Sequence, residues 1–130
     1  MKKIISIFLA IVLFVSLISA CSGKPKFAMT EQHEKFGRKA LEIADAYLDF
    51  EISLDDAYKK IDDLYNAKST LPEGTKEQST GNLLIESDVF SLQSAFWSAR
   101  AKSSGLATAV DSDILGSRND LAELLGAKSR

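Results

Sequence analysis

Cysteine and histidine are almost absent from this chain, which has one of each among its 130 residues. A single cysteine, Cys21, excludes an internal disulfide framework and a zinc site built from several thiolates. The single imidazole, His33, likewise excludes a histidine cluster. We therefore expect neither a metal site nor a bound cofactor. Cys21 needs another explanation, because an unpaired cysteine is unusual in a secreted domain.

An excess of basic residues is also lacking. Lys and Arg number 16 against 18 Asp and Glu, which gives a formal net charge of −2. If residues 1–20 are removed, Lys2 and Lys3 are lost, and the balance becomes 14 minus 18, or −4. Proteins bind nucleic acids mainly through Lys and Arg on the phosphates. An acidic chain of this kind is therefore not expected to have a nucleic-acid partner.

Residues 1–20 have the pattern of an export signal. Lys2 and Lys3 form a positive N-terminal region, and an uncharged apolar run of 17 residues follows from Ile4 to Ala20. This run is at the short limit of the roughly 17 to 25 residues that span a bilayer, so removal of the segment is favoured over a permanent membrane helix. The remaining residues, 130 minus 20 or 110, are expected to form one domain on the outer side of the membrane.

The four residues Ile18-Ser19-Ala20-Cys21 resemble the lipobox of bacterial lipoproteins, which has an aliphatic residue, two small residues and a cysteine. The resemblance covers only residues 1 to 21. It implies that the Cys21 sulfur carries a diacylglyceryl group, that a signal peptidase cleaves between Ala20 and Cys21, and that the new amino group can take a fatty acid such as palmitate. The protein would then be anchored to the outer face of the cell membrane, or to the outer membrane if the host has one. The alternatives are an uncleaved helix, an ordinary secreted protein cut near Ala20, and a chance cysteine.

Residues 21–29 are expected to be the lipidated cysteine and a short tether. The segment is polar and includes Gly23 and Pro25, which favour an extended chain without regular structure. Its full reach, on the order of 25 to 30 Å, would keep the domain close to the bilayer. Lys24 and Lys26 either interact with anionic headgroups or only keep the tether solvated.

Residues 30–126 contain four segments in which apolar residues recur every three or four positions, the spacing of an amphipathic helix. No segment alternates with a period of two. The predicted fold class is therefore all-α, a small bundle of about four helices that follows the signal peptide and tether. Residues 127–130 are expected to be a flexible tail.

Capping residues and glycines set the predicted ends of the helices. The first helix is expected from Thr30 to about Phe50, and the second begins after Ser53 and ends before Leu71, so the two form an antiparallel hairpin. A polar loop is expected over 75–81. The third helix is predicted to be the longest and the most central. It ends at Gly105, and after a loop at 107–110 the fourth extends from about Ser112 to Leu125 and stops at Gly126.

Three groups of residues have types suited to chemistry, and each has a simpler explanation. His33 lies among charged residues in the first turn of a helix and is expected at the surface. The acidic pairs at 55–56 and 62–63 can bind a hard cation, but a solvated helix face beside two lysines explains them better. Residues 111–116 begin like a calcium loop, yet Leu115 and Ala122 stand where ligands are required. No nucleophile with a base is recognisable, so we expect no enzyme.

Phe96, Trp97 and Arg100 are the candidate interaction patch, because aromatic and Arg side chains are favoured in binding hot spots. The alternative is that Phe96 and Trp97 pack in the core with Arg100 at its rim. The sequence therefore predicts a lipid-anchored, non-enzymatic module that binds another protein or a cell-envelope component. The competing hypothesis is a lipoprotein that carries a small ligand or a metal ion.

Overall fold

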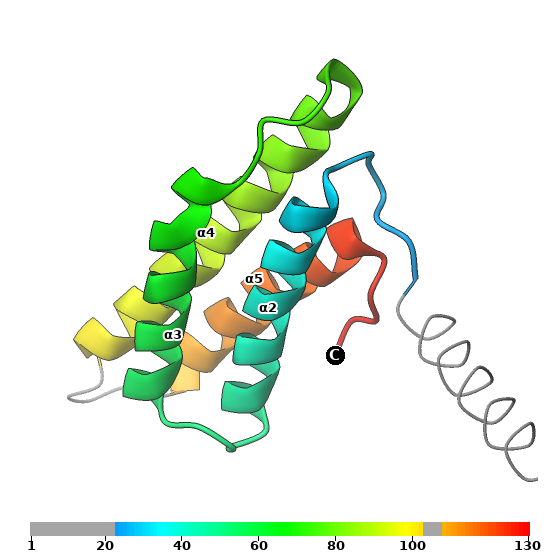
Figure 1. Ribbon diagram of the computed structural model, residues 1–130. Coiled ribbons are helices and arrows are strands. Elements are labelled where there is room, and N and C mark those ends of the chain that lie inside the picture. Colours follow the sequence, from blue (N-terminus) through cyan, green and yellow to red (C-terminus); the bar gives the residue numbers. More distant parts are fainter. Residues whose placement is uncertain (1–22, 103–107) are drawn as a thin grey trace, which may run out of the picture.

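Four helices make up the bundle in the computed structural model, which describes residues 23–102 and 108–130 (Figure 1). The structure confirms the predicted all-α fold, and the described residues contain no strand. The elements in chain order are α2 (Glu31–Leu48), α3 (Leu54–Asn66), the 3₁₀ turns η1 (Ala67–Thr70) and η2 (Lys76–Gln78), α4 (Ser79–Lys102) and α5 (Thr108–Leu125).

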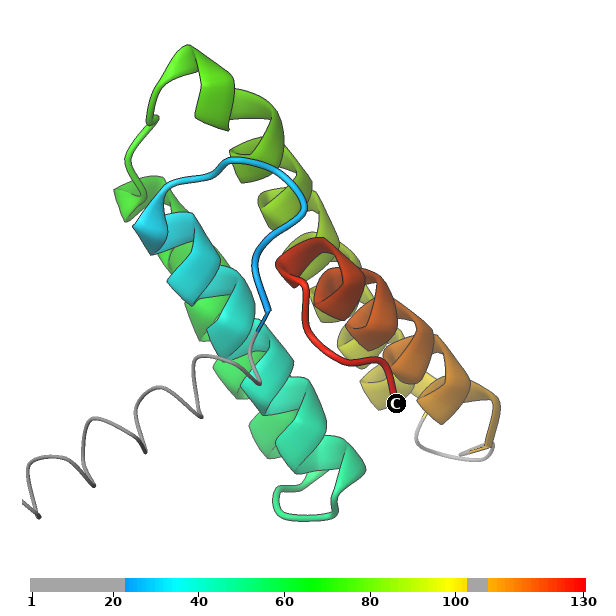
Figure 2. The ribbon, with the colours of Figure 1, turned by 90° about the vertical axis from the view of Figure 1, so that its right-hand side faces the viewer.

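The helices form two hairpins, α2 with α3 and α4 with α5, that pack against each other (Figures 1 and 2). α4 is the longest helix and contacts all three others, as the width of its apolar face predicts. Its buried stripe recurs every three or four residues and occupies the centre of the core. That stripe consists of Ile85, Val89, Leu92, Phe96 and Ala99.

The predicted caps of the first two helices are confirmed. The Thr30 side chain accepts a hydrogen bond from the backbone N–H of His33 at 3.0 Å, and the Ser53 side chain accepts one from Asp56 at 3.2 Å. Acidic residues follow both caps, where they favour the positive end of the helix. At the end of the last helix, Gly126 terminates α5 with a φ of +69°, a conformation that glycine adopts without strain.

Two predicted loops are wrong. Residues 75–81 are not an open loop, because η2 and the first turn of α4 occupy them: the Gln78 side chain accepts from the Thr75 N–H at 2.9 Å, and the Ser79 hydroxyl donates to the Lys76 carbonyl at 2.8 Å. Polar side chains thus close a turn there instead of marking a loop. α5 begins at Thr108, four residues before Ser112, so 108–110 is helical. Gly105 and residue 107 lie outside the described residues.

The α2–α3 turn has an unusual residue at its tip. Phe50 is 94% exposed and has a φ of +60°, the left-handed conformation that normally favours glycine at a helix end. The turn closes behind it, where the Glu51 N–H donates to the Ala46 carbonyl at 2.8 Å. The requirements of the turn therefore place a large apolar side chain in solvent.

Residues 23–29, here called the strap, do not form the free tether that the sequence predicts. The strap lies between α2 and α5 on one side of the bundle (Figure 2). Its Lys26 N–H donates to the Leu124 carbonyl at 2.9 Å, and Arg38 donates to the Gly23 carbonyl at 3.4 Å. Its end is fixed by the Thr30 N–H, which donates to the Asn82 side chain at 3.0 Å. The composition of the strap predicts a free linker, but contacts with residues distant in the sequence hold it against the bundle.

Three glycines allow the strap to lie directly on the helices. A Cβ on Gly81 would come within 2.1 Å of the Ala28 carbonyl oxygen. One on Gly126 would come within 2.1 Å of the Lys24 carbonyl oxygen, and one on Gly23 within 1.9 Å of the Gly126 carbonyl oxygen. Each neighbour is backbone, which cannot move aside as a flexible side chain can. The strap is therefore seated by backbone-to-backbone packing that any larger residue would prevent.

Gly81→Ala is expected to destabilise the protein by about 1 to 3 kcal/mol, because the new methyl group overlaps the strap backbone. The matched control is Gly116→Ala, also inside a helix, where nothing lies within 4 Å of the new Cβ. That change should stabilise the fold by roughly 0.5 to 1 kcal/mol through helix propensity alone. Urea unfolding followed by circular dichroism measures both. Equal stabilisation by the two alanines would show that the strap does not depend on Gly81.

Candidate functional site

The structure separates the three residues of the predicted patch. Phe96 is fully buried in the core, where its ring meets that of Tyr47 edge-on with centroids 5.4 Å apart. Trp97 directly follows Phe96 on α4 but is 60% exposed, so the prediction that this tryptophan packs in the core is wrong. Arg100 lies over the Tyr58 ring at 4.9 Å and pairs with Asp55 at 3.1 Å. The patch therefore retains Trp97 and Arg100 and loses Phe96.

A hollow between α3 and α4 adjoins these two residues. It has a volume of about 210 Å³ and is lined by Tyr58, Phe90, Gln93, Ser94 and Trp97. Three of its five lining residues are aromatic, and the other two offer an amide and a hydroxyl to a bound group. We call this hollow the aromatic groove.

Contacts with α3 hold the walls of the aromatic groove in place. The Phe90 ring packs against Tyr65 with centroids 5.5 Å apart. The Gln93 amide donates to the Asp62 carboxylate at 2.7 Å. The groove is thus a defined surface with rings and an amide in fixed positions, although Phe90 is 51% exposed.

The exposed apolar residues of α4 are seven residues apart. Leu83, Phe90 and Trp97 fall on one side of the helix at this spacing, and they are 68%, 51% and 60% exposed. α4 is therefore apolar on two sides, one in the core and one in solvent. In the sequence, Phe90 and Trp97 lie among the residues of the core stripe. The sequence pattern therefore indicates a wider buried face of the helix and not a separate, exposed one.

His33 is not the surface residue that the sequence predicts. It is only 2% exposed, and both ring nitrogens are engaged: Nδ1 is 2.6 Å from the Thr30 hydroxyl, and Nε2 is 2.9 Å from the Glu86 carboxylate on α4. The missed signal is its position, three residues before Phe36 on the buried side of α2. The neighbouring charged residues Glu31 and Glu34 favour a surface position for His33, although its spacing from Phe36 places it on the buried side.

The Thr30 hydroxyl, the His33 imidazole and the Glu86 carboxylate form a hydrogen-bonded chain. Chains of these three group types also occur in nucleophilic catalysis. The Thr30 hydroxyl is buried and accepts the N–H of His33 as a helix cap. Its backbone N–H is bound to Asn82. In this arrangement the three side chains join the end of the strap and the start of α2 to α4.

The acidic pairs lie as the solvated-face explanation expects, with Asp55, Asp56 and Asp63 exposed and Asp62 bound to Gln93. Among the described residues no three His, Cys, Asp or Glu side chains are grouped closely enough to hold a metal ion.

Asp88 and Asp120 form another acidic pair. Burial raises the pKa of Asp88 above its usual range, and the neighbouring charge of Asp120 raises it further.

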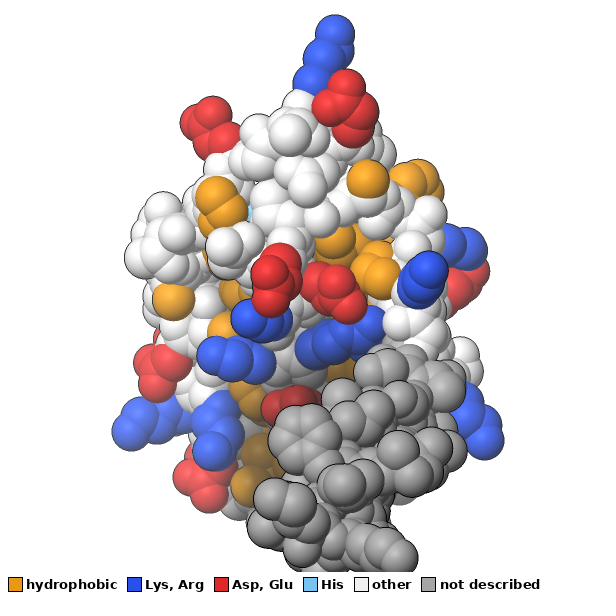
Figure 3. Space-filling view, turned by 45° about the vertical axis from the view of Figure 1, so that its right-hand side comes forward, with side chains coloured by type: hydrophobic (Ala, Val, Ile, Leu, Met, Phe, Trp, Pro, Cys, Tyr) orange, Lys and Arg blue, Asp and Glu red, His pale blue; other side chains and the backbone are white. Residues whose placement is uncertain are grey.

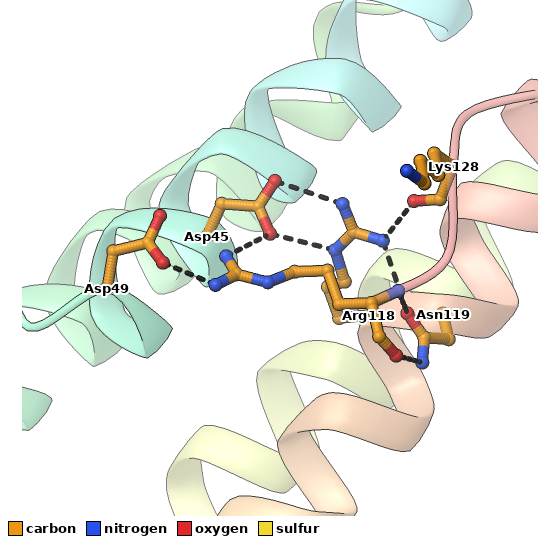
Figure 4. A network of polar contacts seen from close by, with 6 residues as sticks. Asp45, Asp49, Arg118, Asn119 and Lys128 are labelled. Atoms are coloured by element: carbon orange, nitrogen blue, oxygen red, sulfur yellow. Dashed lines mark hydrogen bonds and ion pairs between the residues drawn. The ribbon is translucent and has the colours of Figure 1, made fainter.

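A buried arginine joins α5 to α2 and to the end of the chain (Figure 4). The Arg118 guanidinium forms a two-pronged pair with the Asp45 carboxylate at 2.8 and 3.1 Å, and it donates to the Lys128 carbonyl at 2.6 Å. Arg130 pairs with the same Asp45 and with Asp49, and its hydrogen bond lowers the pKa of Asp49. Instead of the expected flexible tail, residues 127–130 lie along α5 and α2, because these polar contacts offset the loss of chain entropy.

In residues 23–102 and 108–130, no helix has the length and apolar character needed to cross a membrane. No protein-family model matches this chain, and comparisons with curated proteins and with solved structures find no similar protein.

Asp45→Asn is expected to destabilise the protein by about 2 kcal/mol or more, because it leaves the buried Arg118 without a charged partner. Asp49→Asn is the matched control, since it removes only the more exposed ion pair with Arg130 and should cost less than about 1 kcal/mol. Thermal unfolding of both variants at pH 7 separates the two cases. A loss of stability no larger for Asp45→Asn than for Asp49→Asn would contradict a central role for the buried pair.

Proposed function

We propose that this chain is the precursor of an exported lipoprotein that binds another protein through the aromatic groove, without catalysing a reaction. The anchor is a diacylglyceryl group on Cys21, and the domain stands on the outer face of the cell membrane. The groove between α3 and α4, with Trp97 60% exposed at its edge, is the observation on which the binding role rests.

The lipobox-like residues and the apolar segment before them support the anchor. A lipid on Cys21 also accounts for an otherwise unexplained lone cysteine. A diacylglyceryl group contributes two acyl chains, and two chains at about 0.8 kcal/mol per buried methylene hold a protein on a membrane almost permanently, whereas one chain does not.

The composition of the groove supports a protein partner. Trp and Tyr are rigid and lose little entropy on binding, and they are enriched with Arg at the centres of protein interfaces. The exposed apolar surface extends along α4 from Trp97 through Phe90 to Leu83, with one residue every two helical turns. An amphipathic helix of a partner, with apolar residues at the same spacing, would match this surface.

The size of the aromatic groove favours a macromolecule over a small ligand as the occupant of this particular hollow. Its volume of about 210 Å³ is below the range of about 300 to 1,000 Å³ that is typical of small-molecule sites. A side chain of a partner protein fits a hollow of this size, and the rest of the partner can cover the exposed stripe.

Cys21→Ser tests the anchor. We expect the wild-type protein, expressed in a bacterium from the full-length sequence, to partition into detergent and to yield an N-terminal peptide with the mass of a diacylglyceryl cysteine. The serine variant should lose both properties. Normal cleavage and continued membrane association of the serine variant would refute lipidation.

A photo-reactive amino acid at position 97 tests the binding role on intact cells. We expect a discrete cross-linked protein from position 97, and none from position 42, where exposed Glu42 lies on α2. Phe90→Ala should reduce the cross-linked yield by about tenfold or more, the effect of losing one aromatic anchor of roughly 1.4 kcal/mol. Equal cross-linking from positions 97 and 42, or no effect of Phe90→Ala, would count against the groove.

A further inference from the structure

The strap fixes the point at which the chain leaves the bundle. Gly23 is held by Arg38 through its carbonyl and by the close approach of Gly126. Cys21 is two residues before Gly23, a step that spans at most about 7 Å. A lipid on Cys21 would therefore attach beside α2 and α5, with little slack between the bundle and the bilayer.

The exposed residues of the strap have the chemistry of a membrane interface. Phe27 is 44% exposed, and Lys24 and Lys26 are exposed on the same short segment. Phe side chains on a membrane-bound surface enter the boundary between the headgroups and the acyl chains, and lysines next to an anchor are attracted to anionic lipids. Figure 3, which looks obliquely at the strap side, shows Lys and Arg side chains near the middle of that face, with Asp and Glu side chains beside them.

One of these lysines already has a partner. Lys26 pairs with Glu123, but both side chains are more than half exposed, at 57% and 65%. An ion pair this accessible to water contributes little stability and can exchange for a lipid phosphate. Lys26 is therefore available to an anionic headgroup in spite of its contact with Glu123.

The aromatic groove lies on the other side of the bundle. Figure 1 shows α3 and α4 together on the side away from the strap, and Figure 2 shows them behind α2 and α5 when the strap faces the viewer. A surface that rests on the strap side leaves the groove uncovered.

We propose that the strap side of this protein rests on an anionic lipid bilayer, with Phe27 at the boundary between headgroups and acyl chains and Lys24 and Lys26 against the headgroups, so that the aromatic groove faces away from the membrane. The inference rests on the proposed lipid anchor, which brings the strap to the surface. It adds a fixed orientation to that anchor, which a free tether would not impose.

The only tryptophan of the chain, Trp97, is a natural probe of this orientation. The lipidated mature protein, expressed from the full-length sequence, is reconstituted in vesicles of phosphatidylglycerol and acyl-brominated phosphatidylcholine, whose bromine atoms quench nearby indoles. We compare the wild type with the double variant Phe27→Trp/Trp97→Phe, whose single indole lies on the strap. We expect bromination to quench the strap indole about twofold or more and to leave Trp97 unchanged.

Replacing the strap lysines gives a second measurement in the double variant. Lys24→Gln with Lys26→Gln should reduce the quenching at position 27 in vesicles that contain phosphatidylglycerol, and should have a smaller effect in vesicles without it. Circular dichroism verifies that each variant is helical.

The outcomes separate the orientation from the anchor. Protein that floats with the vesicles, but whose strap indole is quenched no more than Trp97, would overturn the orientation and leave the anchor intact. Protein that does not float with the vesicles would overturn both. Quenching confined to position 27 and weakened by the lysine replacements supports the inference.

Discussion

Backbone-to-backbone packing of the strap is the constraint on which the rest of this structure depends. Gly81 and Gly126 leave room for the carbonyl groups of Ala28 and Lys24, and no other residue type would. The strap in turn leads into Thr30, which caps α2 and contacts His33. The two helical hairpins are therefore joined by a segment outside the helices as well as by their own apolar core.

Two buried polar groups reinforce this joint. His33 connects the start of α2 to Glu86 on α4, and Arg118 connects α5 to Asp45 on α2. Both residues are at most 5% exposed, and each has partners for its polar atoms, which keeps the cost of burial low. Because these bonds are directional, they specify how one hairpin sits on the other, whereas apolar packing alone tolerates small shifts.

The sequence predicts most of the helices and little of what joins them. Thr30, Ser53 and Gly126 act on residues close to them in the chain, so their roles can be recognised from local patterns. The environments of His33 and Arg118 depend on Glu86 and Asp45, which are 53 and 73 residues away. No local pattern contains that information. For the same reason the strap reads as a linker, since its partners Leu124 and Gly126 come at the end of the chain.

The candidate site, too, was only partly predictable from the sequence. Residue type identifies Trp97 and Arg100 but groups the buried Phe96 with them, because residue type alone does not reveal which of two adjacent aromatic residues faces solvent. The docked strap also has a mechanical meaning. In the proposed arrangement, a pull on a partner held at the groove would cross the bundle from α4 to the strap, and the backbone contacts of the strap would resist it. The protein would then transmit tension between its partner and the membrane as a stiff coupling, with the slack of only two residues.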